Sequence, residues 1–329
     1  MRIWYDACTG KHTRYGAAIG KRLRKEGHEF IFTTREHPDT MALAKILGEK
    51  PLVVGKYNPS TLFSRLEESS ERILLFSKLF KDNKPDVAIA HQSVELCRTA
   101  FGLGIPIILT ADTPYAYAVN RLTITFAHTV VVSEALPKSF AKSYCPKNIV
   151  QFKGVDEVAW IKDFKPTKMS VKKPMIVLRQ MENKAAYAPE KPHIVKKLAE
   201  DLAALGNVHF IQRYNDEGKV FAEKPIFEDS ASLVANADLV VSYGGTIARE
   251  AALQGVPSIA ISDMAKTNVN TYLARKGFPL FITSEEKVIA HAKKYLGKRF
   301  DVQGKLAELE NPVDVIEKIV ESLRTKKGC

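Results

Sequence analysis

The sequence contains few cysteines, and no two of them form a C-x-x-C pair. In 329 residues there are four, far apart along the chain: Cys8, Cys97, Cys145 and Cys329. This spacing favours neither a zinc site nor a disulfide framework. No apolar run reaches the roughly 20 residues of a membrane span, and "MRIWYDACTG" begins directly as a strand, which argues against a signal peptide. A reduced, cytoplasmic protein is therefore expected.

Motifs for metal-bound diphosphates and for phosphate loops are also missing. No Asp-x-Asp occurs, so the metal–diphosphate arrangement of many sugar transferases is absent, and we expect no metal and no cofactor. "GAAIGKR" (16–22) is one residue too short for a phosphate loop and has no Ser or Thr after its lysine.

Basic residues are in excess. The net charge is +12 and the pI about 9.3, which favours an anionic partner such as a nucleotide. The excess is the same in residues 1–164 and 165–329, and no aromatic-rich basic stripe occurs, so nucleic acid is the less favoured partner.

Short Val- and Ile-rich runs alternate with helical patterns along the chain, as in parallel sheets buried on both faces. A polar segment with two prolines, 163–174, separates two such series. We therefore predict an α/β protein of two doubly wound Rossmann-like domains, 1–164 and 165–329, facing across a cleft. Packing of the last helix back onto the first domain is left open.

"VVSYGGTIAREAALQGVP" (240–257) runs from a predicted strand through two glycines into a predicted helix (246–254). The N–H groups at such a helix start favour an anion. Ser242 and Thr246 add hydroxyl groups, and Glu250 on the second turn could face a ribose diol. The alternative is a tight turn with Glu250 on a solvated helix face.

In the first half, "GKH" (10–12) follows the first strand, and a helix is predicted from residue 13. His12 would then stand at the carboxyl end of that strand, as a general base or as a donor to an anion. Asp112 and His91 follow other predicted strands and are further candidates. Helix capping or a solvent-exposed position is the simpler explanation of His12, whereas for Asp112 capping of the next segment and catalysis stand as equal alternatives.

Taken together, these segments resemble the family called domain of unknown function 354 over nearly the whole chain. The matching landmarks are "IWYDACTGKH", "PDVAIAHQSVELCRTAFGLGIPIILTAD", "GVDEVAW", "VLRQMENKAAY" and "ADLVVSYGGTIAREAALQGVP". The chain is also distantly similar to GT-B glycosyltransferases, including the bacterial enzyme that adds N-acetylglucosamine to lipid I. That resemblance implies transfer of a sugar from a nucleotide sugar, with a UDP-sugar as the expected donor.

The resemblance assigns the ribose to Glu250 and a catalytic or donor-sugar role to His12. The other expected donor contacts are Arg179, Phe227, Ser242, Gly244, Gly245, Thr246, Asn268 and Asn270.

The chain is similar as well to the non-hydrolysing UDP-N-acetylglucosamine 2-epimerases, which share the Asn120-Arg121 pair. Their chemistry needs several acid/base groups, and "HQS" (91–93) and Tyr117-Ala118 stand where carboxylates are expected. Only Asp112 occupies an acidic position, so transfer ranks above epimerisation. A binding protein for nucleotide sugars or nucleic acid, without catalysis, is the non-enzyme alternative.

One segment of the sequence bears on the identity of the acceptor. Residues 60–80 read as an amphipathic helix with Leu62, Leu66, Ile73, Phe76 and Phe80 on one side. Such a helix could touch the inner face of a membrane that carries a lipid-linked acceptor, or it could pack on its own domain. The oligomeric state is not predicted.

Overall fold

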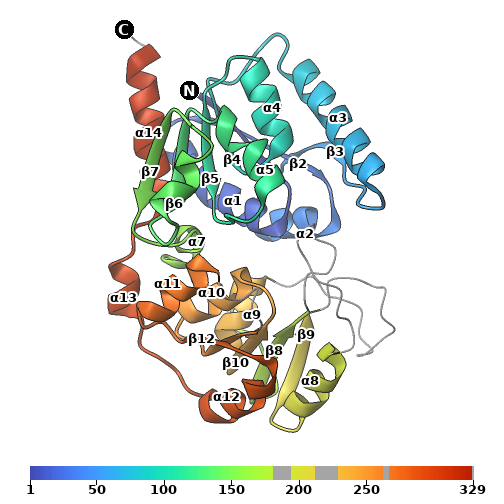
Figure 1. The fold of residues 1–329 in the computed structure, drawn as a ribbon, viewed down its shortest axis with the longest axis vertical. Helices are drawn as coiled ribbons and strands as arrows, with labels where there is room; N and C mark the ends of the chain where they lie inside the picture. Colours follow the sequence, from blue (N-terminus) through green and yellow to red (C-terminus); the bar gives the residue numbers. More distant parts are fainter. Residues whose placement is uncertain (181–193, 212–228, 262–266, 328–329) are drawn as a thin grey trace. The chain divides into compact units, whose positions relative to one another are not determined.

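The computed structural model describes residues 1–180, 194–211, 229–261 and 267–327. The chain divides into two compact units (Figure 1). The first consists of Met1–Trp160 and Glu310–Cys329, and the second of Ile161–Leu309. The units therefore divide after Trp160, beside the boundary expected after residue 164, and the last helix belongs to the first unit.

The first unit is built on a seven-stranded parallel sheet in the order β3-β2-β1-β4-β5-β6-β7. Its strands are β1 (Arg2–Ala7), β2 (Glu29–Glu36), β3 (Leu52–Lys56), β4 (Val87–His91), β5 (Ile107–Ala111), β6 (Thr129–Ser133) and β7 (Asn148–Phe152). Its helices are α1 (Gly10–Lys25), α2 (Pro38–Ile46), α3 (Leu62–Leu79), α4 (Val94–Gly102), α5 (Tyr117–Arg121), η1 (Ile124–Phe126), α6 (Lys138–Lys142) and α14 (Pro312–Lys327), and α7 (Val158–Ile161) lies at the junction. The strand order reverses between β1 and β4, and open α/β sheets bind ligands beyond the carboxyl ends of the strands at such a switch point.

The second unit is built on a five-stranded parallel sheet in the order β12-β11-β10-β8-β9. Its strands are β8 (Met175–Arg179), β9 (Asn207–Ile211), β10 (Leu239–Ser242), β11 (Ser258–Ile261) and β12 (Leu280–Thr283). The described helices are α8 (Ile194–Ala203), α9 (Ser230–Asn236), α10 (Thr246–Leu253), α11 (Asn268–Arg275), η3 (Glu285–Lys287), α12 (Val288–Tyr295) and α13 (Gln303–Ala307). Here the order reverses between β8 and β10, which places Arg179 and the Gly244-Gly245 turn at the switch point.

The predicted α/β class and the two Rossmann-like units are confirmed. Strands β4, β5 and β6 are buried along their whole length, which explains why continuous apolar runs identified them. In the second unit, successive residues of β8 alternate between two cores: Ile176 and Leu178 pack on one side, and Met175 and Val177 on the other.

One predicted boundary is wrong in a way that affects the site. Helix α1 begins at Gly10 rather than at residue 13, because Thr9 caps it and accepts a hydrogen bond from the His12 N–H at 3.4 Å. Lys11 and His12 therefore lie on the first helical turn, which fixes their directions.

Helix α3 does not present the single apolar stripe predicted for it. Phe76 and Phe80 are buried against Trp4, with ring centroids 4.8 and 4.6 Å away. Leu62 and Leu66, in contrast, are 83% and 67% exposed. One side of the carboxyl half of the helix thus packs on the core, whereas the first turns face solvent. Among the described helices, none has both the length and the hydrophobicity needed to cross a bilayer.

Candidate functional site

The Gly-Gly turn of the second unit leads directly from β10 into α10. The Ser242 hydroxyl accepts a hydrogen bond from the Gly244 N–H at 2.9 Å, which fixes the turn. Gly245 is the N-cap of α10, and within the described part of the chain no side-chain cap occurs at this helix start. The N–H groups of the first turn, around half-buried Thr246, are therefore not taken up by a capping side chain and suit an anion.

A buried guanidinium lies against this turn. A Cβ on Gly245 would come within 2.3 Å of Nη1 of Arg249, so only glycine leaves room for that side chain. Arg249 is 5% exposed, and its Nη1 donates to Oδ1 of Asn270 at 3.0 Å. Arg249 does not stand out in the sequence, because an arginine within a helical pattern usually lies on a solvated face. It adds positive charge next to the expected diphosphate position.

Glu250 is buried, not solvated. It is 1% exposed, and its Oε2 accepts a hydrogen bond from the Ser230 hydroxyl at 2.8 Å. The alternative of a solvated helix face is therefore wrong. Ser230 begins α9, next to the N-cap Asp229, and its contact with Glu250 joins segments that no local sequence pattern connects.

The other predicted donor contacts are distributed around this turn. Arg179 ends β8 and pairs in register with Ser242 on β10. Asn268 is exposed at the start of α11, whereas Asn270 is buried and bonded to Arg249. Phe227 lies outside the described residues.

The three predicted catalytic residues of the first unit lie close together. The rings of His12 and His91 are 4.9 Å apart between centroids, and Nε2 of His91 is 3.7 Å from Asp112. Burial, together with the positive charges of Lys11 and Arg35, lowers the pKa of His12 to about 3. His12 is therefore neutral at pH 7; a pKa this low makes it a weak base, and it suits a neutral hydrogen-bonding role better.

Two residues that sequence reasoning missed complete this group. The ammonium of Lys11 lies 2.5 Å from Asp112 and 2.8 Å from Asp156, and 3.9 Å from Glu157. Burial raises the pKa of Asp156 to about 6, against the opposing effect of Lys11. The "GVDEVAW" landmark contains both acids, but no periodic pattern marks an acid as buried.

His91, Asp112 and Asp156 each offer a ligand atom within 4.8 Å of the others, which is close enough for a metal ion. The Lys11 ammonium, however, already lies between the two carboxylates. Because a bound cation would have to displace that charge, we assign no metal to these residues.

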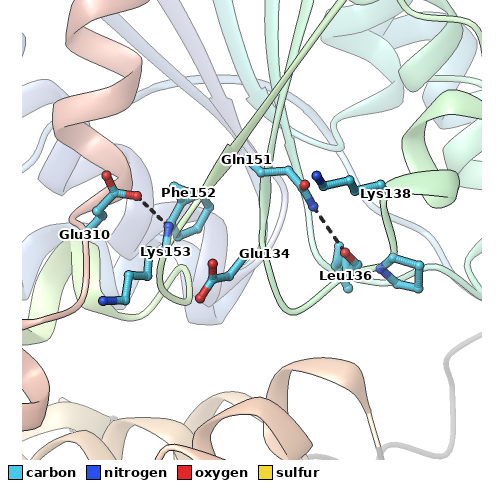
Figure 2. Close-up of a pocket in the computed structure, with 8 residues that line it drawn as sticks. Glu134, Leu136, Lys138, Gln151, Phe152, Lys153 and Glu310 are labelled. Atoms are coloured by element: carbon cyan, nitrogen blue, oxygen red, sulfur yellow. Dashed lines mark hydrogen bonds between the residues drawn. The ribbon is translucent and has the colours of Figure 1, made fainter.

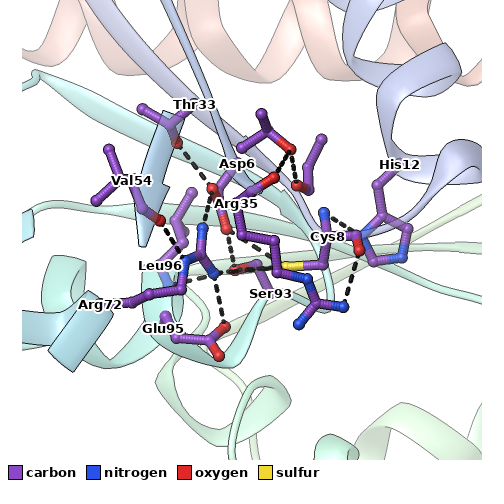
Figure 3. Close-up of polar contacts among 12 residues, drawn as sticks. Asp6, Cys8, His12, Thr33, Arg35, Val54, Arg72, Ser93, Glu95 and Leu96 are labelled. Atoms are coloured by element: carbon purple, nitrogen blue, oxygen red, sulfur yellow. Dashed lines mark hydrogen bonds and ion pairs between the residues drawn. The ribbon is translucent and has the colours of Figure 1, made fainter. Parts of the chain in front are cut away.

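A second charged group supports the turn that carries His12 (Figure 3). Arg72 lies between Asp6 at 2.8 Å and Glu95 at 3.3 Å, and Arg35 donates to the Cys8 carbonyl at 2.9 Å. Burial alone would raise the pKa of Asp6, but Arg72 and hydrogen bonds from neighbouring hydroxyls bring it below the ordinary value. Burial also raises the pKa of Cys8 to about 12, so this thiol is not a nucleophile.

Figure 2 shows a hollow at the carboxyl ends of β6 and β7, still within the first unit. It contains none of the predicted site residues. Its lining is Glu134, Leu136, Pro137, Lys138, Gln151, Phe152, Lys153 and Glu310.

Comparisons with known proteins agree with this architecture. A putative UDP-N-acetylglucosamine 2-epimerase from Listeria monocytogenes has a TM-score of 0.65 at 14% identity, over 95% of this chain and 92% of that one. The glycosyltransferase of kitacinnamycin has a TM-score of 0.60 at 14% identity, over 96% and 98%. At these identities the likeness establishes a two-domain GT-B fold and no activity.

Relatives in sequence carry no assigned activity. The uncharacterized protein MJ0665 of Methanocaldococcus jannaschii is 29% identical over 336 residues, which cover 96% of each chain. A family model described as "Protein of unknown function (DUF354)" matches residues 1–324, including every landmark from the first strand to the Gly-Gly turn. The resemblance read from the sequence is confirmed, and the chain belongs to this family of unknown function.

Proposed function

We propose that the protein is a glycosyltransferase that moves a sugar from a nucleotide sugar, with UDP as the expected carrier, to an acceptor hydroxyl without a metal. The observation that carries the proposal is the start of α10. There, a glycine turn without a capping side chain lies against the buried Arg249, and the buried carboxylate of Glu250 follows one turn later. An anion and an adjacent sugar diol would match these two features.

The proposed reaction has two requirements: stabilisation of the leaving diphosphate, and removal of the proton from the acceptor hydroxyl. The diphosphate would take up negative charge as the bond to the anomeric carbon breaks and the electron pair moves onto its oxygen. N–H groups at the start of α10 and Arg179 would stabilise that charge. The acceptor oxygen forms the new bond to the anomeric carbon, and its proton passes to Asp112, with His12 or His91 as the alternative base.

The acceptor is the least defined part of the proposal. A lipid-linked acceptor, reached by peripheral contact at the inner face of the membrane, would suit the exposed Leu62, Phe63 and Leu66 at the start of α3. Flotation with anionic vesicles tests this part on its own: the proposal of membrane contact fails if the protein stays at the bottom of the gradient.

A second function, epimerisation of the sugar nucleotide, is favoured by one observation. From the sequence, epimerisation ranks lower because carboxylates are missing at the matching positions, yet Asp112 and Asp156 lie together beside His91. Such a group could remove and return a proton at the sugar. Incubating the donor alone in D2O distinguishes the two functions, because only epimerisation incorporates deuterium into the sugar without an acceptor.

The main experiment is calorimetric titration with UDP, GDP, CMP and NAD, with and without EDTA, on the protein and on Glu250→Gln. We expect UDP to bind equally well in EDTA, and Glu250→Gln to weaken binding roughly tenfold or more through loss of a charge-assisted hydrogen bond. Glu308→Gln, an exposed acid of the same unit, is the matched control and should bind normally.

If no nucleotide binds, or if Glu250→Gln binds as tightly as the control, the proposed donor site is wrong. If UDP binds but neither transfer nor epimerisation follows with any acceptor or with donor alone, the protein is a nucleotide-sugar binding protein.

A further inference from the structure

Lys11 joins two carboxylates that are distant in sequence. It lies on the first turn of α1, whereas Asp112 directly follows β5 and Asp156 follows β7. Its ammonium is 2.5 Å from the first carboxylate and 2.8 Å from the second. The sheet thus brings two separate loops to the one ammonium group that α1 carries.

Among these side chains, Asp112 is the most accessible. Its side chain is 18% exposed, against 4% for Asp156 and 3% for His91. Asp112 is therefore the carboxylate that a substrate can reach more easily. Asp156 is more deeply buried and shares Lys11 with it.

The charges around Asp112 oppose one another. Lys11 favours its ionised form, whereas the negative charge of Asp156, which shares that lysine, disfavours it. Among the described residues, the titratable groups around Asp112 are Lys11, His12 and Tyr15 from α1, His91 from β4, and Asp156 from the segment after β7, with Glu157 close to Lys11.

We propose that Lys11 and Asp156 are positioning residues, which set the proton affinity of Asp112 so that it takes the proton of a substrate hydroxyl. Lys11 keeps Asp112 ionised, and Asp156, by sharing the lysine, keeps it basic enough to accept a proton. One ammonium faces three carboxylates here.

The proposal rests on the proposed function for its reaction, but its test does not need the acceptor. The whole protein, labelled with 13C at its Asp carboxyls, is titrated by NMR, and the Asp112 signal is identified by its loss in Asp112→Asn. Lys11→Met should raise the midpoint of Asp112, and Asp156→Asn should lower it, each changing its proton affinity about tenfold or more.

Lys11→Arg should restore the normal midpoint, and Lys21→Met, an exposed lysine on the same helix, should not move it. Once turnover is measurable, the acidic limb of its pH profile should move to higher pH in Lys11→Met and to lower pH in Asp156→Asn. A merely structural role predicts lower turnover with both midpoints unchanged, and that result overturns the proposal, as do shifts of the same sign.

If Lys11→Met does not fold, the midpoint of Asp112 in Asp156→Asn decides the proposal alone: a lower midpoint supports it, and an unchanged one overturns it. Normal UDP binding without these shifts rejects the positioning role and leaves the proposed function standing. Shifts without nucleotide binding reject the proposed function and leave the cluster as a proton-holding group.

Discussion

Gly245 shows how one residue without a side chain can hold a charged one in place. Its position would bring a Cβ within 2.3 Å of Arg249. The atom that must move is the far end of the flexible Arg249 side chain, so adding a Cβ should disturb the fold little. The hydrogen bond from Arg249 to Asn270, in contrast, should be lost or weakened. The effect should therefore fall mainly on anion binding.

We expect Gly245→Ala to weaken UDP binding roughly tenfold, with a small loss of stability, because Arg249 is displaced from the turn. Gly304→Ala is the matched control: its Cβ meets nothing within 4 Å, and the substitution should stabilise helix α13 by about 0.5–1 kcal/mol. Calorimetry and urea unfolding measure both effects. Equal UDP affinity in the two variants would contradict the role given to the turn.

His12 gives a prediction about pH. Its pKa is about 3 in the folded protein and 6.5 as the ordinary value, so the unfolded chain binds the extra proton first as the pH falls. The stability due to neutral His12 is complete above pH 6.5 and is lost progressively between pH 6.5 and 3. We expect His12→Gln to lose less stability than the unmodified protein between pH 7 and 4.5, as measured by urea unfolding. An equal loss in both would show that His12 titrates normally.

At the scale of secondary structure, α3 packs on the core through Phe76 near its carboxyl end, whereas its first turns are exposed. Phe76→Ala should cost about 3–5 kcal/mol, because Phe76 is fully buried against Trp4. Phe63→Ala, on the same helix but 73% exposed, should change stability by no more than about 0.5 kcal/mol. Thermal unfolding distinguishes them, and similar losses would mean that the first turns of α3 are covered in solution.

Helices and strands could be predicted where a segment is buried along its whole length. Their ends were harder to predict where a single capping side chain sets the boundary. The continuous apolar runs that form β4, β5 and β6 could be recognised from the sequence because these strands are buried along their whole length. The start of α1 depended on one hydroxyl, that of Thr9, and was placed three residues late. Lys11, Asp156 and Arg249 were missed because their role comes from contacts between distant segments, which no local pattern records. His12, His91 and Asp112 could be found because each stands at or just after a strand end.

At the scale of the whole molecule, the first unit is completed by the last helix. Arg22 of α1 forms ion pairs with Asp314 and Glu317, each at 2.7 Å. Ile316 and Val320 of the same helix are fully buried. Apolar burial, rather than the half-exposed ion pairs, supplies most of the stabilisation.

Ending the chain after residue 309 should therefore destabilise the first unit by roughly 5 kcal/mol, which is close to the total stability of many domains. The second unit has its own cores and should keep its own unfolding transition. Differential scanning calorimetry measures the two transitions. Loss of both together would show that the units depend on each other for folding.

The return of the chain to the first unit also affects synthesis on the ribosome. Residues 161–309 emerge before α14, so every segment of the second unit is available while the first still lacks its final helix. The order of translation thus differs from the order in which the units can be completed. Until α14 emerges, the surface of the first unit that this helix covers remains open, and a nascent chain stalled at that stage would be a natural client for a chaperone.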